Sequence, residues 1–131
     1  MSDYNAQIIE EFRENHGRVG GHWEGRDLLL LTTRGRRSGR EYTTPVTYTR
    51  DGDRLLVYAS QGGSPDHPDW YLNLVADPHV TVEVGSERFD ATAETVVGEE
   101  RERLVLTIPY FAAQQVKTQR EIPIVVVERL A

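Results

Sequence analysis

Apolar and polar residues along this chain alternate with two periodicities, one typical of helices and one typical of strands. Residues 4–15 place Ile8, Ile9 and Phe12 at helical spacing, which predicts a short amphipathic helix before Gly17. Six later runs resemble strands, and several of them show alternating β-branched and aromatic residues. These runs cover residues 27–33, 41–50, 54–60, 79–84, 88–97 and 122–128. Short turn signals such as Asp51-Gly52 separate several of them, so the sheet should be mostly antiparallel.

Two further helices are expected between the strands. Pro68 suits the first turn of a helix that must end before Asp77-Pro78. Glu99 opens a second helix, in which Pro109 predicts a kink or a break. The pattern indicates one α+β domain with a barrel-like sheet that a helix plugs or covers. We expect residues 1–26 to form an N-terminal helix and loop, and residues 27–131 to form the sheet domain.

Composition narrows the classes of function. The 131 residues include no cysteine, so redox chemistry would require a bound cofactor. The net charge of −6 argues against nucleic acid as a partner. No apolar run approaches the roughly 18 residues of a membrane span, and the N-terminus is polar, so we expect a cytoplasmic protein without an integral membrane segment. The four histidines lack the spacing of metal ligands, and no metal is expected.

One basic cluster stands out in this acidic chain. Four of its fifteen basic residues, Arg34, Arg36, Arg37 and Arg40, lie in the turn between the first two predicted strands. The turn also contains glycines that allow close backbone approach, so its donors could converge on a phosphate. A solvated hairpin tip is the alternative explanation.

A second candidate stretch follows the strand predicted at residues 54–60. It reads Ala59-Ser60-Gln61-Gly62-Gly63 and leads to the helix that begins near Pro68. Glycine pairs expose backbone donors, and helix N-termini attract anions, although the pair could simply turn the chain. Trp70 on that helix is more typical of core packing than of a stacking platform.

Taken together, these stretches resemble the deazaflavin-dependent nitroreductase family of flavin and deazaflavin oxidoreductases. The resemblance extends over roughly residues 27–128 and rests on five motifs in order and on the last apolar strand, residues 122–127. They are Leu28-Leu29-Leu30-Leu31-Thr32-Thr33-Arg34-Gly35-Arg36-Arg37-Ser38-Gly39, Pro45, Asp51-Gly52, Ala59-Ser60-Gln61-Gly62-Gly63 and Pro68-Asp69-Trp70-Tyr71-Leu72-Asn73-Leu74. The resemblance implies a split β-barrel that binds coenzyme F-420, an 8-hydroxy-5-deazaflavin hydride carrier with a phosphodiester and an acidic tail.

The resemblance also implies roles for individual residues. Arg36, Arg37 and Ser38 would hold the phosphate or the tail carboxylates, and Arg40 is a neighbouring cation. Residues 59–63 would line the deazaflavin through backbone groups, and residues 45–47 would flank the ring. The expected coenzyme-binding residues are Arg36, Arg37, Ser38, Arg40, Tyr42, Pro45, Val46, Thr47, Ala59, Ser60, Gln61, Gly62, Gly63 and Trp70. Tyr42 and Gln61 stand where a family member has Arg and Lys.

The implied activity is hydride transfer from the reduced coenzyme to a small organic acceptor such as a quinone, an enone or a nitro compound. Ser60 is the first catalytic candidate, as a hydrogen-bond donor to developing charge, and a structural serine is the alternative. Tyr48 and Tyr110 are further candidates, for which packing is the alternative. Ile108, Phe111 and Ala112 would form an apolar lid that favours flat hydrophobic acceptors, unless they pack a helix on the barrel. The alternative functions are an FMN-binding split-barrel flavoprotein and a non-catalytic coenzyme or lipid carrier. A homodimer is compatible with each of them.

Overall fold

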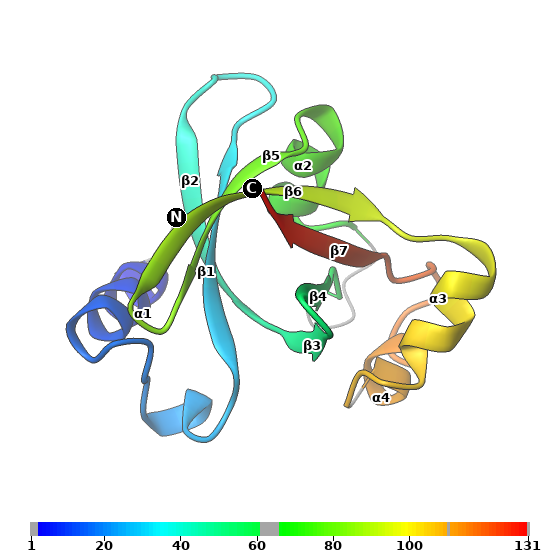
Figure 1. Cartoon of the computed structure of the whole chain (residues 1–131), viewed down its shortest axis with the longest axis horizontal. Helices are drawn as coiled ribbons and strands as arrows, with labels where there is room; N and C mark the ends of the chain where they lie inside the picture. Colours follow the sequence, from blue (N-terminus) through cyan, green and yellow to red (C-terminus); the bar gives the residue numbers. More distant parts are fainter. Residues whose placement is uncertain (1–2, 61–65, 110, 131) are drawn as a thin grey trace.

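A computed structural model of the chain shows a curled antiparallel sheet with helices packed around it (Figure 1). It describes residues 3–60, 66–109 and 111–130. The elements in these residues are α1 (Asp3–Glu14), η1 (Gly21–Trp23), β1 (Leu28–Arg34), β2 (Glu41–Thr47), β3 (Thr49–Asp51), β4 (Arg54–Tyr58), α2 (Asp69–Ala76), β5 (His79–Val84), β6 (Glu87–Thr95), α3 (Gly98–Val105), α4 (Phe111–Gln115) and β7 (Ile124–Arg129).

The seven strands of the described chain lie in the order β2-β1-β5-β6-β7-β4-β3. Consecutive strands β2 and β3 therefore lie at opposite edges, although only Tyr48 separates them. The two edges must approach each other at this residue, which gives the sheet its curled, half-barrel shape (Figure 1). The predicted antiparallel split barrel is confirmed, but with seven strands where the sequence predicted six. The run at residues 41–50 divides because the Tyr48 N–H donates to the carbonyl of Asp27 at 3.0 Å, after which the chain pairs with β4.

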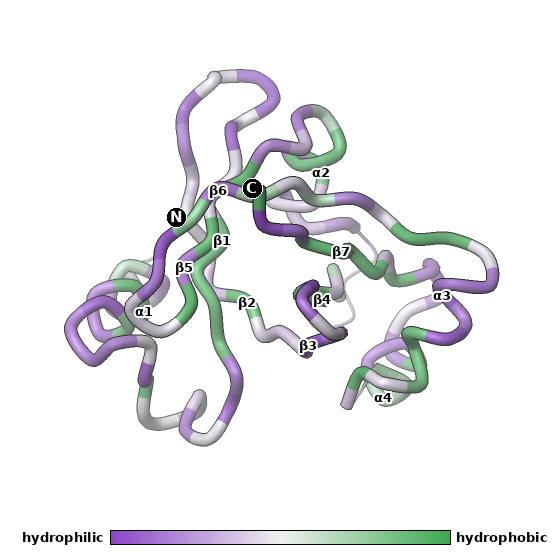
Figure 2. The backbone as a smooth tube through the Cα atoms, viewed as in Figure 1, coloured by the Kyte–Doolittle hydropathy of each residue, from purple (hydrophilic) through white to green (hydrophobic). Residues whose placement is uncertain are grey.

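The interior of the curled sheet holds the largest apolar core, to which β1, β4 and β7 contribute alternate residues. On β1, Leu29 and Leu31 point into this core, while Leu28 and Leu30 pack on the other face with Phe12 of α1. Burial on both faces explains why this strand lacks the polar alternation of a one-sided sheet. β7 is likewise buried over its first four residues and is largely hydrophobic in Figure 2.

Helices close the remaining surfaces of the sheet. Leu74 of α2 inserts into the interior core, and Trp70 and Tyr71 pack against it, so α2 is the helix that plugs the barrel. α3 and α4 cover the outer face of β4 and β7, with Ile108 and Phe111 buried in a second core. The break expected at Pro109 is confirmed, because α3 ends at Val105 and α4 begins at Phe111. None of the described helices combines the length and hydrophobicity that crossing a bilayer requires.

α1 is fastened to the sheet by a long-range ion pair. The Nε and Nη2 atoms of Arg13 donate to the two carboxylate oxygens of Glu83 on β5 at 3.0 and 2.8 Å. The Glu83 side chain is only 11% exposed, and the Arg13 guanidinium offsets the cost of burying its carboxylate. A second close contact follows α1, where Gly17 allows the chain to pass directly against Gly85. A Cβ at Gly17 would lie 2.7 Å from the Gly85 Cα atom.

Removal of the Arg13 guanidinium should therefore destabilise the fold. For Arg13→Ala we expect a loss of about 1 to 3 kcal/mol in the free energy of unfolding, as for a charged hydrogen bond that is partly exposed. Urea denaturation measures this loss. Arg18→Ala is the matched control, because Arg18 is exposed and should change the unfolding free energy by less than about 0.5 kcal/mol. Equal effects of the two substitutions would contradict the assignment.

The β3–β4 hairpin is tied to α3 through Asp51. Its carboxylate accepts hydrogen bonds from Arg54 and, at 3.5 Å, from Arg103 of α3. The hydrogen bond from Arg54 is the main reason that the pKa of Asp51 lies below its usual value, and Arg103 adds to it. A lowered pKa in the folded protein stabilises the fold above the unfolded value of about 3.9, and this stabilisation disappears as the pH falls through the folded value.

The pH dependence of the urea midpoint should reveal how much the Asp51 carboxylate contributes to stability. We expect the urea midpoint of Asp51→Asn to fall less between pH 6 and pH 3 than that of the unmodified protein. Asp53→Asn is the control, since the exposed Asp53 lies two residues away in the same hairpin. Its midpoint should fall as far as that of the unmodified protein, and an equally reduced fall in both variants would refute the role of Asp51.

Candidate functional site

A cleft of about 600 Å³ opens between the arginine-rich turn, residues 34–40, and the beginning of α2. β1, the turn and β2 form one wall, and α2 forms the other. Asn5 of α1 contributes to the rim. The lining residues are Asn5, Thr33, Gly35, Arg36, Arg37, Ser38, Tyr42, Thr44, Pro68, Asp69, Trp70 and Asn73. The structure thus brings the first and last of the sequence motifs together around one cleft.

Asn73 joins the two walls of the cleft. It is 4% exposed, and its Oδ1 atom accepts from the backbone N–H of Arg36 at 3.2 Å and from Nη1 of Arg36 at 2.8 Å. Its Nδ2 atom donates to Oγ1 of Thr33 at 3.3 Å. Arg36 also pairs with Asp69 at 3.3 Å. The Arg36 side chain therefore fastens the turn to α2.

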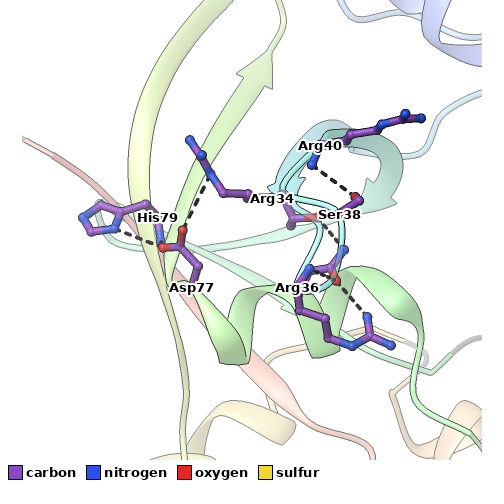
Figure 3. A network of polar contacts seen from close by, with 8 residues as sticks. Arg34, Arg36, Ser38, Arg40, Asp77 and His79 are labelled. Atoms are coloured by element: carbon purple, nitrogen blue, oxygen red, sulfur yellow. Dashed lines mark hydrogen bonds and ion pairs between the residues drawn. The ribbon is translucent and has the colours of Figure 1, made fainter.

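The turn itself is compact because of Gly35. Its N–H donates to the carbonyl of Arg40 at 2.7 Å, and a Cβ at this position would lie 2.6 Å from the ring of Tyr42. The Tyr42 hydroxyl lies 3.1 Å from Oγ of Ser38. The same Oγ atom accepts from the Arg40 N–H at 3.2 Å (Figure 3). Ser38 and Tyr42, both expected at the coenzyme, therefore lie in one hydrogen-bonded group at the rim.

The four arginines of the turn have different surroundings. Arg34 points away from the cleft toward Asp77, at 3.9 Å, and His79 contacts the same carboxylate at 3.2 Å (Figure 3). The backbone N–H of His79 and then its ring lower the pKa of Asp77. Within the described residues, the guanidinium groups of Arg37 and Arg40 have no hydrogen-bond or ion-pair partner. These two are the cations that remain available for a ligand.

β2 presents its two faces to different surroundings. Val46 lies in the interior core on the same face as Tyr42 and Thr44, which line the cleft. Pro45 and Thr47 belong to the opposite face, because they pair across the sheet with Leu30 and Leu28, which pack beneath α1. Any contact of Pro45 and Thr47 with a ring in the cleft would therefore involve their backbone. Their coenzyme-binding role stays a prediction.

The segment that follows β4 depends on Arg120, which the sequence did not point to. Ala59 is fully buried and Ser60 is half-buried, and their carbonyls accept from Nη2 of Arg120 at 2.9 and 2.8 Å. The predicted site residues Gln61, Gly62 and Gly63 lie outside the described residues. Trp70 is half-buried, packs on the interior core and lines the cleft. Its position is therefore compatible both with core packing and with a stacking platform for a ligand.

The curled antiparallel sheet and its plug helix place this chain in the class of small split-barrel proteins, with a cation-bearing cleft beside the helix. The particular family follows from comparison: residues 6–129 match the model of the family described as "F420H(2)-dependent quinone reductase", and the chain belongs to this family. An "F420H(2)-dependent quinone reductase" of Mycobacterium tuberculosis is 38% identical over 126 residues, covering 90% of this chain and 85% of the relative. A second Mycobacterium tuberculosis protein, described as a putative reductase of the same kind, is 34% identical over 102 residues, covering 75% of this chain and 86% of that relative.

Solved structures agree with this assignment. A structure titled "F420-H2 Dependent Reductase (FDR-A)" superposes with a TM-score of 0.69 at 38% identity, covering 83% of this chain and all of that one. A structure described as a domain-swapped dimer superposes with a TM-score of 0.72 at 36% identity, covering 96% and 98% of the two chains. The sequence-based assignment to an F-420-dependent oxidoreductase family is therefore confirmed, with F-420 as the coenzyme.

Proposed function

We propose that this chain binds reduced F-420 in the cleft and passes its hydride to a quinone. The observation that carries the proposal is the position of Arg37 on the cleft and Arg40 in the same turn, both without a partner in the described residues of an acidic chain. An anionic coenzyme fits this arrangement, because guanidinium groups bind phosphate and carboxylate through charge-assisted hydrogen bonds. When bound, the reduced coenzyme supplies the hydride, so the protein needs no nucleophile.

Different residues of the chain would then bind the coenzyme and orient the groups that contact it. Arg37 and Arg40 bind the negative groups, and Arg36 holds the turn against α2 through Asn73. Ser38 and Tyr42 complete the rim, and the Trp70 ring forms part of the wall. The Ser60 hydroxyl is proposed to donate a hydrogen bond to charge that develops on the acceptor.

The quinone acceptor rests on the names of the relatives and on the confirmed family. It does not rest on the predicted apolar lid. Ile108 and Phe111 are 6% and 5% exposed and pack in the core beneath α3 and α4, where Phe111 contacts the ring of Tyr58. The alternative interpretation, that they pack the helices on the barrel, matches this arrangement, and only Ala112 of the three is exposed.

Anaerobic turnover tests the proposal. The purified protein is mixed with reduced F-420 and either menadione, cyclohexenone or a bicyclic nitroimidazole, and the return of the oxidised chromophore is followed. We expect menadione to react fastest, with overlap among acceptors, because apolar contacts discriminate by only about 1 to 3 kcal/mol. Turnover with reduced FMN in place of F-420 would favour the flavoprotein alternative. Binding of F-420 without turnover of any acceptor would favour the carrier.

The oligomeric state and the domain organisation of the chain can also be proposed. A relative of similar fold is described as a domain-swapped dimer, and we propose that this chain also forms homodimers, which light scattering during gel filtration would test. We also propose that residues 1–26 and 27–131 form one domain, because α1 shares a core with β1. A single cooperative unfolding transition is expected. A cytoplasmic location stays a prediction of the sequence.

A further inference from the structure

Arg120 contacts the chain on both sides of the Gly62-Gly63 motif. Its Nη2 atom donates to the carbonyls of Ala59 and Ser60, and its Nη1 atom lies 3.0 Å from Nδ1 of His67. His67 in turn packs against the ring of Tyr71 on α2, with ring centroids 5.1 Å apart. One guanidinium thus connects the end of β4 to the loop that enters α2.

The direction of the two carbonyls is the informative part of this contact. In an extended strand, successive carbonyls point to opposite sides, so one nitrogen cannot bind both. The Ala59 N–H still donates to the carbonyl of Pro123 at 3.1 Å, as a strand residue would. Beyond it the backbone turns, so that both carbonyls meet Nη2 of Arg120. Arg120 therefore sets the backbone path at the point where β4 ends.

A fixed carbonyl also fixes the amide on the other side of its peptide plane. Because the peptide is planar and trans, the Ser60 N–H points away from the Ala59 carbonyl and hence away from Arg120. A cationic donor on that carbonyl polarises the peptide and makes its N–H a stronger donor. The contact accordingly orients and strengthens a backbone donor in the stretch that resembles the deazaflavin-binding motif.

The backbone of Arg120 is held in place by Gln115, the last residue of α4. Nε2 of Gln115 donates to the Arg120 carbonyl at 2.7 Å, and Oε1 of Gln115 accepts from the Ile122 N–H at 3.0 Å. Arg101 of α3 donates to the Ile122 carbonyl at 2.7 Å. Gln115 contacts Arg120 itself and so fixes the backbone from which its guanidinium extends to Ala59 and Ser60, whereas Arg101 contacts Ile122, two residues farther along the chain.

We propose that Arg120 is a positioning residue for coenzyme binding, which acts by orienting the Ala59 and Ser60 backbone. The proposal rests on the function proposed above. Lysine cannot replace it, since one ammonium lacks the planar fork that reaches two carbonyls and an imidazole. Both Arg120→Lys and Arg120→Ala should therefore weaken the binding of coenzyme, with a larger effect on KM for the reduced coenzyme than on kcat.

Fluorescence titration with oxidised F-420 tests this role. We expect Kd to rise about tenfold in both Arg120 variants, and millimolar methylguanidinium to restore binding by Arg120→Ala. Arg101→Ala is the matched control: it removes a guanidinium that holds the same segment but does not touch Ala59 or Ser60. Its Kd should stay within about twofold of the unmodified protein. Equal Kd values in Arg120→Lys and Arg101→Ala would overturn the proposal.

Hydrogen exchange without coenzyme separates this proposal from the proposed function. Amides of the peptide that contains Ala59 and Ser60 should exchange faster in Arg120→Lys than in Arg101→Ala. If the unmodified protein fails to bind F-420, the proposed function fails, and equal exchange in the two variants would overturn the role of Arg120 as well. If neither Arg120 variant folds, Gln115→Ala replaces them, and an unchanged Kd there would count against the proposal.

Discussion

Replacing Arg37 and Arg40 together with alanine is expected to weaken the binding of oxidised F-420 by about 2 to 4 kcal/mol, or roughly 30- to 1000-fold in Kd. These two guanidinium groups have no partner among residues 3–60, 66–109 and 111–130, so no group described there competes with the coenzyme for them. Fluorescence titration measures the loss. It should become smaller in high salt, because screening already weakens exposed ion pairs.

Arg34 supplies the matched control for this double variant. It lies in the same turn and carries the same charge, but its side chain points to Asp77 on the other side of β1 (Figure 3). Arg34→Ala should therefore leave Kd within about threefold of the unmodified value. If Arg34→Ala weakens binding as much as the double variant, general electrostatic attraction explains binding and the turn is no specific site. Unchanged binding in the double variant would remove the turn from the site.

Asn73→Ala is expected to lower the free energy of unfolding by about 1 to 3 kcal/mol, because the partly buried hydrogen bonds from the Arg36 backbone N–H and guanidinium lose their acceptor. It should also raise Kd for F-420, since the turn loses its attachment to α2. Urea denaturation and fluorescence titration measure the two effects. They are expected to occur together, because the same amide holds the turn and shapes the cleft.

The Asn73→Asp variant distinguishes this explanation from a simple loss of volume. Aspartate keeps an acceptor for both donors of Arg36 and gives up only the donation to Thr33. Most of the stability and of the coenzyme affinity should therefore return. If aspartate is as damaging as alanine, Arg36 does not depend on the Asn73 acceptor, and the attachment of the turn needs another explanation.

The order of helices and strands could be predicted because each is encoded locally. The alternation in residues 79–84 gave the bounds of β5, and Pro109 marked the break between α3 and α4. The division of residues 41–50 could not be predicted, because β-rich residues continue through Tyr48. The break arises because β2 pairs with β1 whereas β3 pairs with β4. A local sequence pattern does not specify which strands pair with each other.

The site was predicted in the same uneven way. The arginine turn was visible as a charge cluster, and anion binding was predicted for it, whereas the structure places its arginines in different surroundings. Arg36 is bound by Asn73, 37 positions away, and the carbonyl of Ala59 by Arg120, 61 positions away. A lone asparagine among apolar helix residues was the available signal for Asn73. No sequence signal pointed to Arg120, since arginine is a common residue in polar loops.

The place of β7 in the sheet has a consequence for how the protein is made. β7 lies between β6 and β4, yet it comes after both of them in the chain. During synthesis, β4 and β6 therefore have no shared partner until residues 124–129 have left the ribosome. Two unpaired strand edges would be open to other nascent chains throughout that interval. A slow step late in translation should favour aggregation, and rapid completion of the last strand should protect against it.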